Sequence, residues 1–154
     1  MTALRTNSLA LLAVLAIFAA QGRAQTKNSG VEAELRKDAL SRLRITVRSL
    51  ATAPATIYKS ELPWELRHSI ILTAVTSAGD SLPQNVVAGD PSLQKITLNP
   101  GQSVSGDIDL KTVFKDLDGA RRKSDVLLFW AYRSPDGLNL PKWSGGWIVI
   151  PRMQ

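Results

Sequence analysis

Leu43 to Ser49 reads LRITVRS, and its apolar residues Leu43, Ile45 and Val47 alternate with polar ones. Successive side chains of a β-strand point to opposite faces, so this alternation predicts a strand with one buried and one solvated face. Prolines and glycines interrupt the chain at short intervals after this stretch, which is typical of turns between strands. The stretch therefore predicts an antiparallel, all-β architecture.

Further short runs carry strand patterns at 56–59, 69–76, 93–98, 103–110, 125–133 and 146–151. The run 125–133 (DVLLFWAYR) is apolar on both faces, which predicts a central strand that places Phe129 and Trp130 in the core. About seven short strands, with no long helical segment after residue 43, favour two packed sheets, and the predicted fold is an immunoglobulin-like antiparallel β-sandwich. A closed β-barrel is the alternative, because strand order cannot be read from the sequence.

The first 24 residues have the layout of a secretory signal peptide. Arg5 lies in a basic start, Leu9–Ala20 is apolar throughout, and Gly22 and Ala24 supply small residues before a cut at Gln25. The apolar run has 12 residues, whereas a membrane-spanning helix needs about 20. We therefore expect a cleaved signal, a periplasmic or extracellular location, and no membrane span in the mature chain.

Removal of residues 1–24 from the 154 leaves 130 residues, the size of one domain. Residues 25–42 are expected to form a polar lead-in or a short helix, because apolar residues recur every four to five positions from Val31 to Leu43. The β-sandwich domain is expected to span residues 43–154. The sequence thus predicts one domain behind a processed N-terminus.

Charge and cysteine content exclude several classes of function. The whole chain carries +6, and loss of Arg5 and Arg23 leaves 17 basic against 13 acidic residues, or +4. This charge favours solubility and weak attraction to anionic surfaces, but it lacks the basic stripe of a nucleic-acid-binding protein. The chain has no cysteine, which excludes disulfides, thiolate zinc sites and thiol catalysis.

His68 is the only histidine, and no G-x-S-x-G motif is present. A Ser-His-Asp relay needs a histidine that is oriented by a carboxylate and lies beside a nucleophile. A zinc site with one histidine and no thiol would need several convergent carboxylates, and their spacing does not suggest one. His68 is therefore interpreted as a surface or hydrogen-bonded histidine.

The acidic residues include two close pairs, Asp107 with Asp109 and Asp116 with Asp118. The first pair shares one face of a predicted strand, which fits a solvated face better than paired-carboxylate catalysis. The second pair resembles part of a calcium loop, but the basic run 121–123 follows it in a predicted loop and would repel the ion. We predict no catalytic residue, no metal site and no cofactor.

The tryptophans are the best functional lead in the sequence. Trp143 and Trp147 flank a Ser-Gly-Gly segment, and indole rings on a flexible loop can stack on sugars or anchor a protein. Trp64 follows Pro63, which stiffens the turn that carries the ring. The predicted ligand-binding residues are Lys142, Trp143, Trp147 and Trp64. The alternative interpretation is that the rings fold back and fill the end of the sandwich.

An export signal, no cysteine, immunoglobulin-like strands and tryptophan-bearing segments together resemble secreted protease inhibitors of the chagasin type and small bacterial carbohydrate-binding modules. Pro141-Lys142-Trp143 is only faintly similar to the Arg-Pro-Trp loop of the inhibitors. Their Asn-Pro-Thr-Thr-Gly loop is missing, so no functional residue is carried over. The resemblance concerns the fold alone.

The leading hypothesis is an exported, non-enzymatic β-sandwich that binds a protein or carbohydrate partner through its loop ends. The first alternative is a secreted protease inhibitor that presents Lys142-Trp143-Ser144. A hydrolase that uses the aspartate pairs is less favoured. The sequence gives no indication of the oligomeric state.

Overall fold

The computed structural model describes residues 30–65, 69–85 and 92–154. The predicted signal peptide and His68 lie outside these residues. The strands are β1 (Val31–Arg36), β2 (Ala39–Arg48), β3 (Ala55–Tyr58), β4 (Ile70–Thr76), β5 (Lys95–Leu98), β6 (Ser103–Asp109), β7 (Val126–Arg133) and β8 (Trp143–Ile150). The helical elements are the 3-10 turns η1 (Lys59–Glu61) and η2 (Pro63–Glu65) and the short helices α2 (Leu110–Val113) and α3 (Leu117–Lys123).

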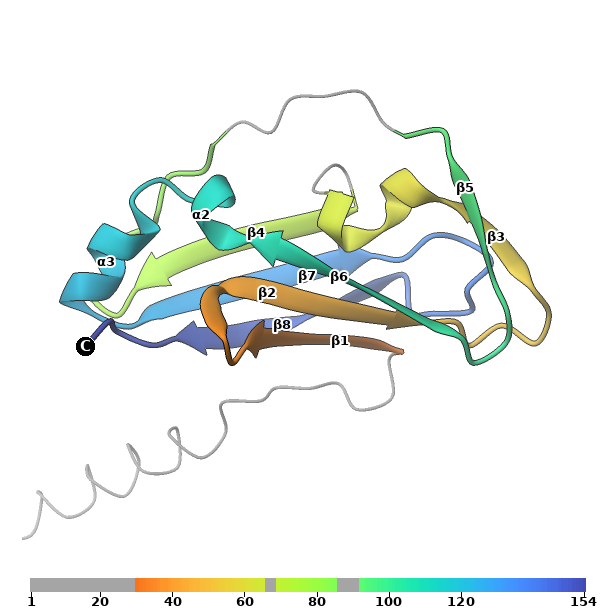
Figure 1. The fold of residues 1–154 in the computed structure, drawn as a ribbon, viewed down its shortest axis with the longest axis horizontal. Helices are drawn as coiled ribbons and strands as arrows, with labels where there is room; N and C mark the ends of the chain where they lie inside the picture. The colour runs from red at the N-terminus through yellow and green to blue at the C-terminus, as the bar shows by residue number, and fades with distance from the viewer. Residues whose placement is uncertain (1–29, 66–68, 86–91) are drawn as a thin grey trace, which may run out of the picture.

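Two three-stranded antiparallel sheets form the two layers of the molecule (Figure 1). One has the order β1-β2-β6 and the other the order β4-β7-β8. With β1, β2, β4, β6, β7 and β8 taken as strands A, B, C, E, F and G, these are the A-B-E and C-F-G orders of an immunoglobulin-like sandwich. The predicted sandwich is therefore confirmed, and the sheets do not close into the alternative barrel.

A separate two-stranded ribbon of β3 and β5 extends one end of the sandwich (Figure 1). β3 follows β2 in the chain and β5 precedes β6, so the ribbon continues the β2–β6 pair beyond a bend. Ala55 lies opposite Leu98 in this ribbon, and Ile57 lies opposite Ile96. The ribbon is not strand D of the immunoglobulin arrangement, because strand D pairs with strand E, whereas among the described residues β3 and β5 pair only with each other.

The core lies between the two sheets and is formed by every second residue of their strands. From β2, Leu43, Ile45 and Val47 are all buried. From β7, the buried inward residues are Val126, Leu128, Trp130 and Tyr132. Facing sheets pack about 10 Å apart, so alternate side chains of each sheet fill the space between them. The prediction that Trp130 belongs to the core is confirmed.

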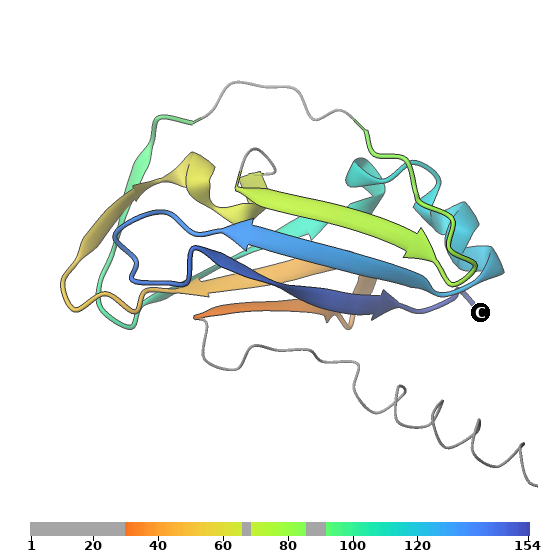
Figure 2. The same ribbon diagram turned by 180° about the vertical axis from the view of Figure 1, so that it is seen from behind.

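The two open sides of the sandwich are closed differently. On one side, β1 and β8 lie next to each other (Figures 1 and 2). On the other side, the chain between β6 and β7 folds into α2 and α3, which bury Leu110, Val113, Phe114 and Leu117. Residues 114–116 link the two helices. In the described part of the chain, no helix has the length and apolarity to cross a membrane.

The helix expected within residues 25–42 is wrong for the part that the structure describes. Val31–Arg36 forms β1, which pairs antiparallel with β2. Val31 is buried, whereas Glu32 and Glu34 are exposed, so the segment does alternate with a period of two. Alanine, glutamate, leucine and arginine favour helix intrinsically. Pairing with β2 therefore outweighs the local preference of this segment.

Tyr132 is fully buried and donates a hydrogen bond from its hydroxyl to the Glu61 carbonyl oxygen at 3.2 Å. Burial raises the pKa of this hydroxyl, and the Glu61 charge adds to the effect. An unfolded chain releases the tyrosine proton above about pH 10. The folded chain keeps this proton to a higher pH than the unfolded chain does. The stability of the fold therefore falls as the pH rises beyond that point.

We predict that Tyr132→Phe lowers the free energy of unfolding by about 1 kcal/mol at pH 7, because the half-buried Glu61 carbonyl loses its partner. The difference from the wild type should narrow between about pH 9 and about pH 11, since only the wild type carries the buried tyrosine proton. Urea unfolding at a series of pH values measures this. Tyr58→Phe, at an exposed position of β3, is the control and should leave stability at pH 7 unchanged. A difference that stays constant or widens with pH would contradict this account.

Candidate functional site

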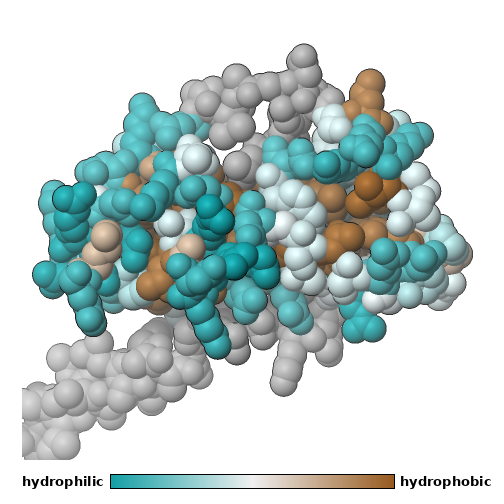
Figure 3. Space-filling model, viewed as in Figure 1, coloured by the Kyte–Doolittle hydropathy of each residue, from teal (hydrophilic) through white to brown (hydrophobic). Residues whose placement is uncertain are grey.

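The outer face of the β1-β2-β6 sheet is polar. Its cross-strand rows are Glu32–Thr46–Ser105 and Glu34–Arg44–Asp107. The Thr46 and Ser105 hydroxyls are hydrogen-bonded at 2.8 Å. Figure 3 views the molecule from this side and shows hydrophilic side chains spread over its left and centre. This face has the chemistry of an ordinary solvated sheet surface.

Asp107 is held between two arginines on this face. Arg44 Nε donates to Asp107 Oδ1 at 2.8 Å, and Arg36 Nη1 donates to Asp107 Oδ2 at 3.0 Å. Hydrogen bonds from Arg44, followed by those from Arg36, hold the pKa of Asp107 below its usual range. A carboxylate so stabilised in its charged form is a poor proton donor at neutral pH. This argues against an acid–base role for Asp107.

The outer face of the β4-β7-β8 sheet, turned toward the viewer in Figure 2, is apolar. Phe129 of the central strand is 45% exposed, Ile71 of β4 is 57% exposed, and Trp143 of β8 is 50% exposed. Trp147 lies directly opposite Phe129 and is half-buried. Several large hydrophobic side chains exposed together on one surface are typical of a contact site, whereas single exposed hydrophobic residues are common on any protein. We call this surface the aromatic face.

The register of the three strands arranges the aromatic face in rows across the sheet. From one end of the strands to the other, the rows are Val75–Leu127–Val149, Thr73–Phe129–Trp147, Ile71–Ala131–Gly145 and the pair Arg133–Trp143. Side chains directly opposite on antiparallel strands are about 5 Å apart at Cβ, so each row is a contiguous surface. The aromatic residues therefore form one surface with the aliphatic ones.

Trp143 and Trp147 lie on the same face of one strand, but not on a loop as predicted. Both belong to β8, and Ser144 between them is buried and pairs with Tyr132. Gly145 is a regular strand residue here, and a Cβ at this position would lie 2.7 Å from the Trp130 carbonyl oxygen. The two tryptophans are consequently held on a rigid sheet and do not fill the end of the sandwich. Lys142 is exposed immediately before the strand.

Trp64 does not join the other tryptophans. It lies in η2, is half-buried and packs against the core from the β6 side. A Cβ at Gly106 would overlap Trp64 Cδ2, so the indole covers this glycine closely. Gly106 pairs in register with Ile45, so β6 has no bulge at this glycine. Its lack of a side chain makes room for the ring.

The other three members of the two aspartate pairs have structural roles. Asp109 caps α2 by accepting from the Lys111 amide at 3.0 Å, and Asp116 caps α3 by accepting from the Gly119 amide at 3.2 Å. Asp118 pairs with Lys111 at 2.7 Å. Within residues 30–65, 69–85 and 92–154, no three His, Cys, Asp or Glu side chains are grouped so as to hold a metal ion.

The basic run at 121–123 forms the last turn of α3 and not an exposed loop. Arg121 is buried, and its Nε donates to the Pro151 carbonyl oxygen at 3.0 Å. The Met153 amide donates to the Arg121 carbonyl oxygen at 2.9 Å. Arg121 therefore fastens the C-terminal segment to α3, which leaves only Arg122 and Lys123 as exposed charges in this run.

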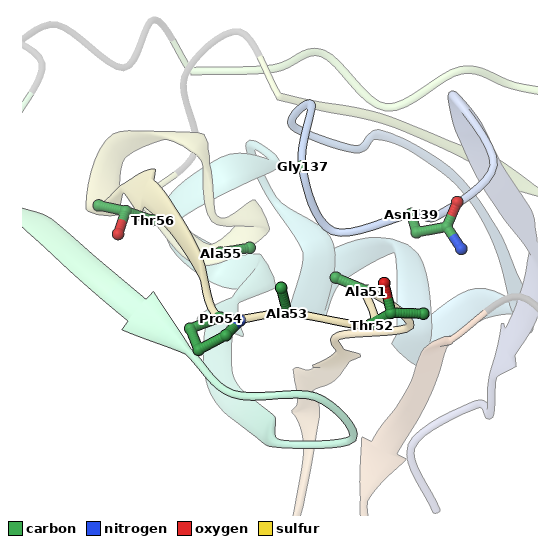
Figure 4. A pocket seen from close by; sticks show the side chains of 8 residues that line it. All are labelled: Ala51, Thr52, Ala53, Pro54, Ala55, Thr56, Gly137 and Asn139. Atoms are coloured by element: carbon green, nitrogen blue, oxygen red, sulfur yellow. The ribbon is translucent and has the colours of Figure 1, made fainter.

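A shallow hollow of about 450 Å³ lies at the loop end of the sandwich (Figure 4). It is lined by the link between β2 and β3 (Ala51, Thr52, Ala53, Pro54, Ala55, Thr56) and by Gly137 and Asn139 of the link between β7 and β8. None of these eight lining residues is titratable or aromatic. The hollow thus lacks groups for acid–base chemistry and for stacking on a ligand.

The chain matches no protein-family model, and no curated protein is significantly similar to it.

Sequence reasoning missed most of the aromatic face. Phe129 was expected in the core beside Trp130, but the two side chains of adjacent strand residues point to opposite faces. Ile71, Leu127 and Val149 were not predicted as site residues. The alternation in the sequence shows that each of them points away from the core side of its own strand. Only the pairing of β4, β7 and β8 shows that they lie side by side.

We predict that Gly106→Ala lowers the free energy of unfolding by about 1–3 kcal/mol, because the added Cβ displaces the Trp64 indole. In a Trp64→Ala background the same change should cost much less, since the clashing ring is gone. Urea denaturation of the wild type, both single variants and the double variant measures the coupling. An equal cost of Gly106→Ala in both backgrounds would show that Trp64 does not cover Gly106.

Proposed function

We propose that this chain is an exported, non-enzymatic binding module that recognises a protein partner through its aromatic face. The observation that carries the proposal is the exposure of Ile71, Phe129 and Trp143 on one sheet surface. Water contact with this surface is unfavourable by about 25 cal/mol for each Å² of apolar area. A partner that covers it removes this cost, and the rigid sheet needs little ordering on binding.

A protein fits this surface better than a glycan does. Sugar recognition combines ring stacking with side-chain hydrogen bonds, and small-molecule sites keep a few placed polar groups among their apolar lining. Between Trp143 and Trp147 the face offers Ala131 and Gly145, which supply no polar side chain. An apolar centre with aromatic residues and an arginine at its border is typical of protein interfaces.

The other candidate functions have less support. A protease inhibitor would present Lys142-Trp143-Ser144 as a projecting loop, whereas Trp143 and Ser144 lie in β8 and Ser144 is buried. A hydrolase would need a free carboxylate pair, whereas Asp107 is engaged by two arginines and Asp109 caps α2. Export itself rests on the predicted signal at residues 1–24.

Site-specific photocrosslinking in the producing cells tests the proposal. A benzophenone amino acid in place of Ile71 should give a discrete protein adduct, because this position borders the apolar centre. The same group in place of Ser105, on the outer face of the other sheet, is the matched control and should give none. Phe129→Asp added to the Ile71 probe should weaken partner binding about tenfold or more, as expected for a central contact worth about 2 kcal/mol, and the adduct should disappear.

Three outcomes would contradict the proposal. One is an adduct of equal yield from both positions, and another is no adduct from Ile71. The third is retention in gels that contain polysaccharide, lost in Trp143→Ala while the melting temperature is unchanged, which would identify a glycan-binding face instead.

A further inference from the structure

The aromatic face carries charges of opposite sign at its two ends. Asp125 precedes β7 and Arg133 ends it, and both are exposed. Asp125 lies one residue before β7 but continues its pairing with β4, because its carbonyl oxygen accepts from the Ser77 amide at 3.1 Å. Each charged residue is four residues from Phe129 and therefore points to the same side of the sheet as Phe129. At about 3.3 Å per residue, each charge lies about 13 Å from Phe129 along the strand. The carboxylate and the guanidinium are thus placed evenly about the centre of the face.

On β7 and β8, side-chain size differs between the two sides of the Phe129 row, whereas β4 carries the large Val75 and Ile71 on both sides. The row on the Asp125 side carries the bulky Leu127 and Val149 on β7 and β8. The corresponding row on the Arg133 side carries the small Ala131 and Gly145 on the same two strands. When a second copy is rotated by half a turn about this row, the large side chains of these two strands meet the small ones of the other copy. The surface of β7 and β8 is therefore complementary to itself.

We propose that the protein partner of the aromatic face is a second copy of this chain, joined in a two-fold symmetric dimer. This inference rests on the proposed function of the face as a contact surface. The axis runs across the sheet along the row Thr73–Phe129–Trp147, between the two stacked copies. Each β7 then lies antiparallel over the β7 of the other copy.

This symmetry places complementary groups over one another. Leu127 and Val149 of one copy meet Ala131 and Gly145 of the other, and Arg133 meets Asp125 twice in the dimer. Phe129 and Trp147 lie near the axis and stack on their own copies, where aromatic pairs are favourable. The salt-bridged outer face of the β1-β2-β6 sheet stays in water, as its charges require.

The expected strength of the dimer follows from its size. Three strands about 4.8 Å apart and about 26 Å long give a face of about 370 Å² per copy, which is smaller than a standard specific interface and corresponds to a weak, transient contact. We therefore expect dissociation in the micromolar range, and sedimentation or light scattering between about 1 and 300 µM covers the transition. The wild-type mature chain should pass from monomer to twice the monomer mass over this range.

Charge reversal distinguishes a dimer of this chain from a complex with a different protein. Arg133→Asp should leave the chain monomeric, because it sets a carboxylate against Asp125 of the other copy. Asp125→Arg should do the same by setting two cations together. An equimolar mixture of these two variants should restore the dimer mass, since each new charge then meets its opposite. Matched controls with the same charge changes on the other sheet, Arg48→Asp at the end of β2 and Asp38→Arg in the turn between β1 and β2, should dimerise like the wild type.

Folding of each variant is checked by its melting temperature. Asp125 also accepts a hydrogen bond from the Arg152 amide at 2.7 Å, so Asp125→Arg carries a structural cost. Should this variant not fold, Phe129→Asp is the second test, because it sets two carboxylates together near the axis and should abolish the dimer. Phe129 is on the surface and outside the core, so this variant should stay folded.

The outcomes separate this inference from the proposed function. A wild type that stays monomeric at every concentration, while Ile71 still crosslinks to a different protein, overturns the dimer and leaves the binding module intact. A dimer that persists in Phe129→Asp, or a mixture of folded charge variants that stays monomeric, also overturns the dimer. Failure of both self-association and Ile71 crosslinking overturns the two proposals together.

Discussion

The interdigitation of two alternating inner faces is the constraint on which the rest of this structure depends. Leu43, Ile45 and Val47 of β2 and Leu128, Trp130 and Tyr132 of β7 are buried between the sheets. Because the chain has no cysteine, no disulfide joins the sheets, and apolar burial must supply the stabilisation that a disulfide gives many secreted domains. Strand alternation then leaves every second residue outside this core, and the two outer faces are free to differ.

The outer face of one sheet is polar, and that of the other is apolar. The outer face of β1-β2-β6 is covered by polar rows and by the pairing of Asp107 with Arg36 and Arg44. Exposed ion pairs of this kind contribute less than about 1 kcal/mol each. They therefore make this face hydrophilic but add little to the stability of the fold. The aromatic face has Phe129, Trp143 and Ile71 in water. Folding alone gives no reason for this exposure, whereas contact with a partner does.

The sequence was sufficient for the strands whose two-residue period is made of strong β-formers. The patterns of β2, β4, β6 and β7 predicted these strands within a few residues, and the central place of β7 in its sheet is confirmed. β1 was missed because Val31–Arg36 consists largely of residues with high helix propensity, and only its partner β2 makes it a strand. Trp143 and Trp147 were placed on a loop because glycines within strands are uncommon, and the close approach of Gly145 to the Trp130 carbonyl could not be foreseen.

The candidate site was predicted in part, since Trp143 and Trp147 belong to it but Trp64 and the loop end do not. A run such as VLLFWAYR shows that both faces of β7 are apolar, but it does not show whether a second layer covers the outer one. The acidic pairs illustrate the same limit, because N-caps such as Asp109 and Asp116 depend on where the helices begin. Alternation is a local property, whereas exposure depends on what the whole fold places over a surface.

Hydroxyl-radical footprinting of tryptophan in producing cells, compared with dilute purified protein, tests the central claim most directly. If the aromatic face is a contact surface, Trp143 and Trp147 should be oxidised more slowly in cells than in the dilute protein, while Tyr58 on β3 is oxidised equally in both. Equal oxidation of Trp143 and Trp147 in the two settings would show that nothing covers the face.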